Sequence, residues 1–232
     1  MKMIEPNEFR EWNEGMIKKY DPDSFHHHSN LIIRFIEKKR VKIIINLLTI
    51  HKEDRLLEIG CGAGNVIEKA PRGKLYGVDI SSYILNKAKQ RQHKNVFLFQ
   101  GDAQNLPCKD QIFCNIICSE VLEHLLNPLD ALHEMSRILK TNGVAIISIP
   151  NESLINCLKR ILVRMRIFRW FLNRRGEYQQ MPQRMNDEWH LHSLKLEQWL
   201  DLFGRIFEVA QVRKVPFFWL PLRYVIRVEK LK

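Results

Sequence analysis

Three glycines at alternate positions follow an apolar run that contains one acid. The run is Leu56-Leu57-Glu58-Ile59, and the glycines are Gly60, Gly62 and Gly64. Glycine has no Cβ, so the backbone can turn tightly here and approach a ligand closely. A strand, a glycine-rich turn and a helix form the first unit of a nucleotide-type site on a parallel sheet. We therefore predict such a ligand at this turn, with the N-terminal amides of a helix over 65–70 facing it.

The spacing of these glycines differs from the dinucleotide-binding fingerprint, Gly-x-Gly-x-x-Gly. Counted from Gly60, that fingerprint needs a glycine at position 65, where the chain has Asn65. Acids end or follow the next two predicted strands, at Asp79 and Asp102. A carboxylate such as Asp79 can accept hydrogen bonds from both hydroxyls of a ribose. Taken alone, Asp79 could equally cap the helix that follows it.

Three histidines are candidate general bases, because the pKa of an imidazole lies near working pH. His124 follows the fourth predicted strand, where a substrate at the sheet edge would lie. His190 and His192 share one face if their segment is extended. We expect His124 first and His192 second as the base. Each could instead pack or form a structural hydrogen bond, in which case catalysis relies on alignment alone.

Short apolar runs alternate with helical patterns from Arg55 onward, which predicts a parallel sheet covered by helices on both faces. Right-handed crossovers place the carboxyl ends of these strands at one edge, where ligands bind. We read Thr141-Asn142-Gly143 as a turn in which the glycine takes positive φ. The predicted strands are 55–59, 75–80, 96–100, 113–119, 144–149, 207–214 and 225–230, and the predicted helices are 65–70, 82–92, 129–139 and 194–203.

Length and composition predict one domain over 1–232, with a helical N-terminal cap over 1–50. No run of 18 apolar residues occurs, and the polar start is unlike a signal peptide. The five cysteines form no Cys-x-x-Cys pair, which favours reduced thiols and a cytoplasmic location. No sequence-local pattern around the tract His26-His27-His28 completes a metal site, so we expect no metal.

A basic segment over 151–186 interrupts the alternation. Seven cations and no acid lie between Leu154 and Arg175, and without them the net charge falls from +11 to +4. An apolar stripe with cations beside it predicts an amphipathic helix. This helix could cover an acceptor pocket as a lid, lie on an anionic membrane through 154–175, or bind RNA phosphates. The stripe consists of Leu154, Leu158, Ile161, Leu162, Met165, Phe168 and Leu172.

Taken in order, these motifs resemble those of the class I S-adenosylmethionine-dependent methyltransferases, from Arg55 to about Asn151. The stretch Ser119–Leu125 and the strand end Ser148–Asn151 are similar to the methyltransferase type 11 group related to ubiquinone-pathway O-methyltransferases. The resemblance implies a Rossmann-like α/β fold with a seven-stranded, mostly parallel sheet whose last strand is antiparallel. It also implies that Asp102 reads the adenine amine. The implied S-adenosyl-L-methionine-binding residues are Glu58, Gly60, Cys61, Gly62, Gly64, Asp79, Ile80, Asp102, Ala103, Ser119 and Glu120.

This resemblance implies methyl transfer to oxygen or nitrogen of a small-molecule or lipid-linked acceptor. A tRNA-modifying methyltransferase and a non-catalytic cofactor-binding protein remain alternatives. Enzymes that methylate amino groups of nucleic acids carry Asp/Asn-Pro-Pro-Tyr after the fourth strand, where this chain has Ser119-Glu120-Val121-Leu122. Cytosine C5 enzymes use a Pro-Cys nucleophile there, whereas Ile117 precedes Cys118, which favours a buried strand cysteine. Nucleic acid is thus the less favoured partner.

Overall fold

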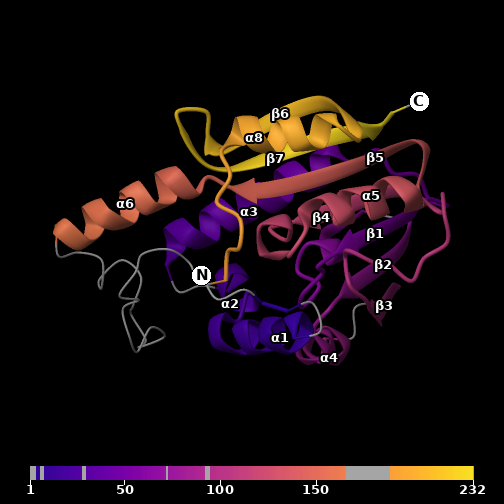
Figure 1. The fold of residues 1–232 in the computed structure, drawn as a ribbon, viewed down its shortest axis with the longest axis horizontal. Coiled ribbons are helices and arrows are strands. Elements are labelled where there is room, and N and C mark those ends of the chain that lie inside the picture. Colours follow the sequence, from indigo (N-terminus) through magenta and orange to yellow (C-terminus); the bar gives the residue numbers. More distant parts are fainter. Residues whose placement is uncertain are drawn as a thin grey trace.

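The computed structural model describes residues 4–5, 8–27, 30–71, 73–91, 95–165 and 189–231. Its centre is a seven-stranded sheet in the order β3-β2-β1-β4-β5-β7-β6 (Figure 1). Strands β1 to β5 pair in parallel, and β7 is antiparallel to both of its neighbours. The predicted sheet, including its antiparallel last strand, is confirmed. The strands are β1 (Arg55–Ile59), β2 (Lys74–Asp79), β3 (Val96–Gln100), β4 (Phe113–Ser119), β5 (Leu139–Pro150), β6 (Phe207–Phe217) and β7 (Leu220–Lys230).

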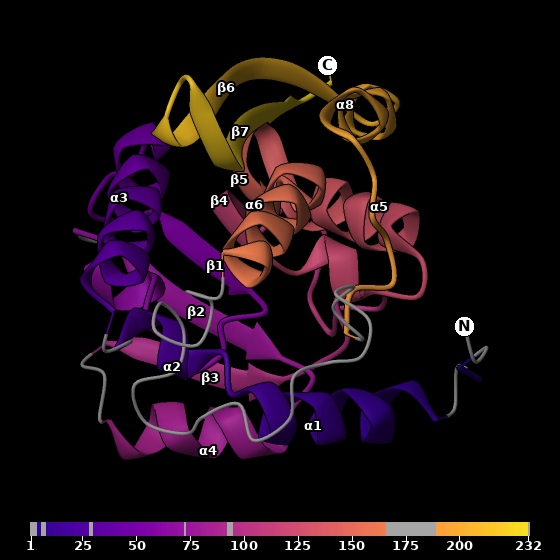
Figure 2. The same ribbon diagram turned by 90° about the vertical axis from the view of Figure 1, so that its left-hand side faces the viewer.

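Helices cover both faces of this sheet. Figure 2 shows α3 on one side of the strands and α5 and α8 on the other, with α6 extending beside the strand ends. The N-terminal segment is helical, as predicted, and α1 packs on α4. The helices are α1 (Phe9–Tyr20), α2 (Asp23–His26), α3 (Leu31–Leu47), α4 (Ser82–Gln90), α5 (Pro128–Ile138), α6 (Glu152–Arg164) and α8 (Leu196–Gly204), with 3-10 turns η1 (Ile67–Lys69) and η2 (Leu122–His124).

Two hydrophobic cores fill the two sides of the sheet. In β1, Leu57 and Ile59 belong to the core that includes α5 and α8, whereas Leu56 belongs to the core beneath α3. Successive side chains of a strand point to opposite faces, and most apolar side chains of β1, β4 and the second half of β5 are buried on one face of the sheet or the other. This burial holds the carboxyl ends of the parallel strands in one rigid row.

Two local predictions were wrong. The helix expected over 65–70 is only the short turn η1, because the chain becomes extended at Ala70, which precedes Pro71. β5 begins at Leu139 and so contains the expected turn, in which Asn142 takes the positive φ of 62° instead of Gly143. The Cβ of any larger residue at Gly143 would meet Leu139 at 2.7 Å, so packing explains that glycine.

The amphipathic helix expected in the basic segment is present as α6. None of its residues is fully buried, and its apolar stripe faces the space beside the strand ends. Phe168, Leu172 and most of the cations after Arg164 lie outside the described residues. Among the described helices, none has the length and apolar character needed to cross a bilayer.

Candidate functional site

A large cavity of about 670 Å³ opens at the carboxyl edge of the parallel strands. Its floor is the glycine turn after β1 and the ends of β2 and β4. Its walls come from α2, α3, α6 and the β6–β7 turn. The cavity therefore joins the glycine turn to α3, α6 and the β6–β7 turn.

The glycine turn has the backbone shape that the residues predict. Gly60, Gly62 and Gly64 all have positive φ, at 65°, 51° and 82°. The amide of Cys61 donates to the carbonyl of Val78 at 3.0 Å, which ties the turn to the end of β2. Gly60 and Gly62 line the cavity, whereas Gly64 is part of the turn but does not line the cavity.

Two buried carboxylates, Asp79 and Glu58, accept hydrogen bonds from backbone amides in and around this turn. Asp79 accepts hydrogen bonds from the amides of Gly62 and Ser81, both at 2.9 Å. Burial raises the pKa of Asp79 to about 6, against the opposing effect of those amides. Burial likewise raises the pKa of Glu58 to about 8, against the opposing hydrogen bond from Ile67. A carboxylate oxygen can accept a second hydrogen bond, so Asp79 keeps acceptor capacity toward the cavity.

The other predicted cofactor residues follow β2, β3 and β4 around the same cavity. Asp102 is held by the amide of Gln104, which donates to its Oδ1 at 2.9 Å. Glu120 lies in the left-handed region at a φ of 56°. Of the eleven predicted cofactor residues, ten line the cavity: Glu58, Gly60, Cys61, Gly62, Asp79, Ile80, Asp102, Ala103, Ser119 and Glu120.

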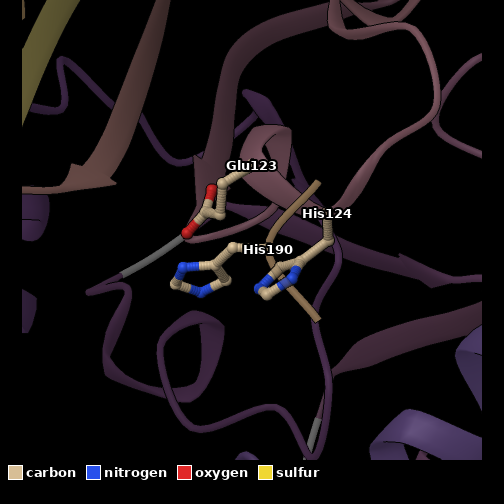
Figure 3. Close-up of side chains that lie close together, drawn as sticks. All are labelled: Glu123, His124 and His190. Carbon is tan, nitrogen blue, oxygen red and sulfur yellow. The ribbon is translucent and has the colours of Figure 1, made fainter. Parts of the chain in front are cut away.

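His124 and His190 stand together in the cavity beside Glu123 (Figure 3). Their ring centroids are 4.7 Å apart, and Trp189 stacks at 4.3 Å from the His124 ring. Burial and the neighbouring His190 lower the pKa of His124 to about 3, so this imidazole is neutral at pH 7 but weakly basic. His192 does not line the cavity, and its Nε2 lies 2.9 Å from the carbonyl oxygen of Leu125.

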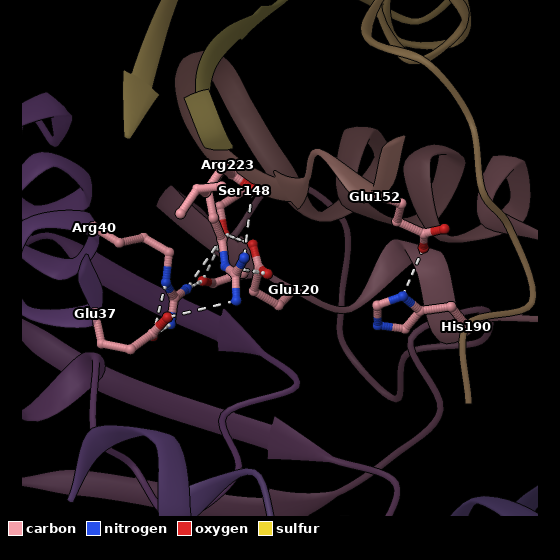
Figure 4. A network of polar contacts seen from close by, with 9 residues as sticks. Glu37, Arg40, Glu120, Ser148, Glu152, His190 and Arg223 are labelled. Atoms are coloured by element: carbon pink, nitrogen blue, oxygen red, sulfur yellow. Dashed lines mark hydrogen bonds and ion pairs between the residues drawn. The ribbon is translucent and has the colours of Figure 1, made fainter. Parts of the chain in front are cut away.

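A buried network on α3 was missed by the sequence analysis. Glu37 and Arg40 form an ion pair at 2.6 Å, and Arg40 also donates to the hydroxyls of Ser119 and Ser148. Arg223 of β7 pairs with Glu120 at 2.8 Å and approaches Glu37 at 3.7 Å (Figure 4). The signal was an acid and a base three residues apart within an apolar helix face, where isolated charges are costly.

The outer rim of the cavity is apolar and exposed. Phe218 and Trp219 at the β6–β7 turn are 79% and 65% exposed, and Phe35 of α3 is 48% exposed. Phe217 links these elements, because its ring lies 6.2 Å from Phe35 and 5.1 Å from Trp219. This apolar rim consists of Leu31, Ile32, Phe35, Ile161, Met165, Phe217, Phe218 and Trp219.

Comparison with known proteins gives a family match over the centre of the chain. Residues 57–147 match the model described as a methyltransferase domain. The chain is 32% identical over 142 residues to a demethylmenaquinone methyltransferase of Staphylococcus aureus, covering 57% of this chain and 56% of that protein. It is 30% identical over 137 residues to an uncharacterized protein of Methanocaldococcus jannaschii, covering 58% and 59%. The chain thus matches less than two thirds of the length of these relatives.

Solved structures extend the fold similarity over almost the whole chain. One is a Thermotoga maritima SAM-dependent methyltransferase described as a possible histamine N-methyltransferase, with a TM-score of 0.65, 23% identity and coverage of 96% and 100%. Another is the N-methyltransferase NodS of Bradyrhizobium japonicum in complex with S-adenosyl-L-homocysteine, with a TM-score of 0.66, 16% identity and coverage of 94% and 98%. The predicted resemblance to class I methyltransferases is confirmed for residues 57–147 in sequence and for the chain in fold.

Proposed function

From the methyltransferase match over residues 57–147, we propose that this protein transfers the methyl group of S-adenosyl-L-methionine to an oxygen or nitrogen of a lipid-linked acceptor. The observation that carries the proposal is the single cavity that joins the glycine turn and Asp79 to the apolar rim. A cofactor at the turn and an acceptor entering past the rim would meet beside Glu123, His124 and His190.

The floor of the cavity supports the cofactor assignment. Asp79 would accept the ribose hydroxyls, and the backbone of Gly60 and Gly62 would leave room for the amino-acid part of the cofactor; all three residues line the cavity. Asp102 and the amide of Ala103 would receive the adenine. These assignments follow the resemblance, and the positions of all these residues around one cavity are in line with it.

The rim supports the acceptor class. A small polar acceptor gains nothing from exposed aromatic side chains, whereas an acyl or prenyl chain buries them at roughly 25 cal/mol per Å² of apolar surface. The side chains of α6 that line the cavity, such as Leu158 and Ile161, would continue this apolar path inward, as a lid would. The similar protein from Staphylococcus aureus is named for the acceptor demethylmenaquinone, which is compatible with the class of lipid-linked acceptors.

Methyl transfer depends more on alignment of the acceptor with the methyl group than on general acid–base catalysis. The acceptor lone pair attacks the methyl carbon, and the carbon–sulfur bond breaks with its electron pair remaining on sulfur. The enzyme must therefore hold the acceptor in line behind that carbon and exclude water. Because His124 is weakly basic, we assign it no proton removal of its own. Glu123, His124 and His190 together would form a surface that aligns the acceptor.

Replacing Asp79 tests the cofactor site. Asp79→Ala removes the acceptor of two ribose hydrogen bonds, and each bond to a charged group contributes about 1.5–3 kcal/mol. We expect calorimetry with S-adenosyl-L-homocysteine to show at least a roughly 100-fold loss of affinity. Glu208→Ala, an exposed acid on β6, serves as the control. Affinity equal to the unmodified chain in a folded Asp79→Ala variant would overturn the assignment.

A further inference from the structure

Glu123 is a buried acid without a described partner. Its side chain is 1% exposed, and neither carboxylate oxygen has a hydrogen-bond partner among the described residues. A buried polar group without a partner costs about 1–3 kcal/mol, and more when it is charged. Such a group needs a compensating ligand, and its oxygens face the two histidines of the cavity (Figure 3).

Both histidines have one ring nitrogen already engaged. Nδ1 of His124 lies 3.2 Å from the carbonyl oxygen of Trp189, which can only accept, so this nitrogen carries the proton. Nδ1 of His190 lies 2.6 Å from Oε1 of Glu152 (Figure 4), and that hydrogen bond lowers the pKa of Glu152 against the effect of burial. This arrangement favours the tautomer that leaves Nε2 as the lone-pair donor. Histidines that bind metals are held in the same way, by a carbonyl or a carboxylate on the second nitrogen.

The three groups converge from two segments of the chain. One potential ligand atom from each of Glu123, His124 and His190 lies within 4.8 Å of the others. The amides of Leu191 and His192 donate to the carbonyl of Glu123 at 2.8 and 3.1 Å, which fixes the segment that carries His190 against η2. Ligands bound tetrahedrally to one ion at about 2.1 Å lie roughly 3.4 Å apart, so a contraction of up to about 1.4 Å completes the set.

We propose that Glu123, His124 and His190 form a binding site for a divalent metal ion. One carboxylate and two imidazoles suit zinc, manganese or iron(II), whereas magnesium and calcium prefer oxygen ligands alone. The site revises the expectation from sequence that no metal is bound. Neighbouring acids are already engaged, because Glu120 pairs with Arg223 and Glu58 accepts from Ile67.

The position of the ion gives it a role that rests on the proposed function. Three protein ligands leave coordination positions open toward the cavity. An acceptor hydroxyl bound there would lose its proton to water more readily, because the cation stabilises the oxyanion that then attacks the methyl carbon. This would supply the activation that the weakly basic His124 cannot. Metal binding itself does not depend on that role.

The test uses the full chain after treatment with a chelator. Calorimetry and elemental analysis with zinc, manganese and magnesium salts, each alone, should show one transition-metal ion bound per chain and weaker binding of magnesium. Cobalt(II) should give visible absorption bands typical of mixed nitrogen and oxygen ligands. Glu123→Gln and His190→Gln keep the side-chain volume, and each should weaken zinc or manganese binding at least 100-fold. Glu152→Gln should weaken it by roughly 10–100-fold through His190.

Matched controls separate this site from other histidines. His133→Gln removes an exposed histidine of α5 and should leave the affinity unchanged. Metal that still binds to Glu123→Gln with unchanged affinity would belong to another group, such as the tract His26-His27-His28, and would overturn the assignment. Absence of stoichiometric binding to the unmodified chain would overturn it too. Cofactor calorimetry on the same samples is independent, so a failed metal site and a failed methyltransferase assignment give different results.

Discussion

At the scale of single residues, Gly60 is required both by its backbone conformation and by a neighbouring side chain. Its φ of 65° lies in the left-handed region, and a Cβ at this position would lie 2.3 Å from Cγ2 of Val121. Val121 belongs to the segment that leads into Glu123 and His124. Gly60 therefore lets the cofactor turn and the histidine cluster approach each other, and this tertiary contact was not visible in the alternating glycines.

Gly60→Ala should destabilise the protein. The left-handed backbone costs about 1–2 kcal/mol and the overpacking against Val121 about 1–3 kcal/mol, so we expect a loss of roughly 2–5 kcal/mol in the free energy of unfolding. Denaturant titration measures this loss. Adding Val121→Ala should recover the packing part only. Gly15→Ala in α1, where a Cβ meets nothing within 4 Å, should instead raise stability by about 0.5–1 kcal/mol. Unchanged stability of Gly60→Ala would refute the contact.

Residue chemistry alone located much of the candidate site. Asp79 and the glycines were predicted from their residue types and spacing, and the role of Asp102 from the family resemblance. Glu123 and His190, 67 positions apart, are brought together by the backbone hydrogen bonds that dock 191–192 on η2. The sequence analysis gave His192 precedence over His190 because it could not know that the backbone carbonyl of Leu125 engages the His192 ring.

At the scale of elements, α3 is tied to the sheet by charge as well as by apolar contacts. Burial alone would raise the pKa of Glu37, but the guanidiniums of Arg40 and Arg223 lower it to about 2. The same network reaches Ser119 at the end of β4. It fixes the helix that supplies one wall of the cavity and part of the apolar rim.

This network should make stability depend on pH below 5. Because the folded-state pKa of Glu37 is depressed, its contribution is present above the unfolded pKa of 4.5 and is lost as pH falls toward 2. A shift of this size corresponds to roughly 3 kcal/mol. Chemical unfolding of Glu37→Gln and the unmodified chain should differ by about that amount at pH 7 and converge toward pH 2. The exposed Glu53→Gln is the control, and a difference that persists at pH 2 would contradict the prediction.

The elements that depend on residues close together in the chain were predicted best. Strands β1, β3 and β4 begin and end at the predicted residues, because short apolar runs are distinctive. The predicted helix over 65–70 was wrong because the chain becomes extended at Ala70, which precedes Pro71. The final strands are longer than predicted because they pair with each other across the β6–β7 turn.

At the scale of the whole molecule, cations lie on the same helices, α3 and α6, that carry part of the apolar rim. Lys38 and Lys42 of α3 are exposed, and Nζ of Lys39 lies 4.3 Å from the ring centroid of Phe217. On α6, Lys159 lines the cavity and Arg164 is exposed. An apolar edge flanked by cations suits the surface of an anionic membrane, from which a lipid-linked acceptor would enter.

Vesicle sedimentation tests this orientation. The full chain should pellet with vesicles that contain anionic lipid, less with neutral ones, and less again at high salt. Removing two exposed aromatic side chains in Phe218→Ser with Trp219→Ser should weaken binding by about 10–100-fold. Phe97→Ser, which alters an exposed aromatic of β3 outside the rim, is the control. No pelleting with either vesicle, or methyl transfer to tRNA in place of lipid extracts, would contradict a membrane-borne acceptor.

The sequence by itself determined the sheet, the glycine turn and the acids of the proposed cofactor site. These depend on residues close together in the chain, where periodicity, strand ends and glycine stereochemistry act directly. Only the tertiary structure decided which histidine faces the cavity, that Glu123 is buried without a described partner, and that α3, α6 and the β6–β7 turn share one apolar rim. Those features depend on packing between distant segments, for which no local pattern carries a signal.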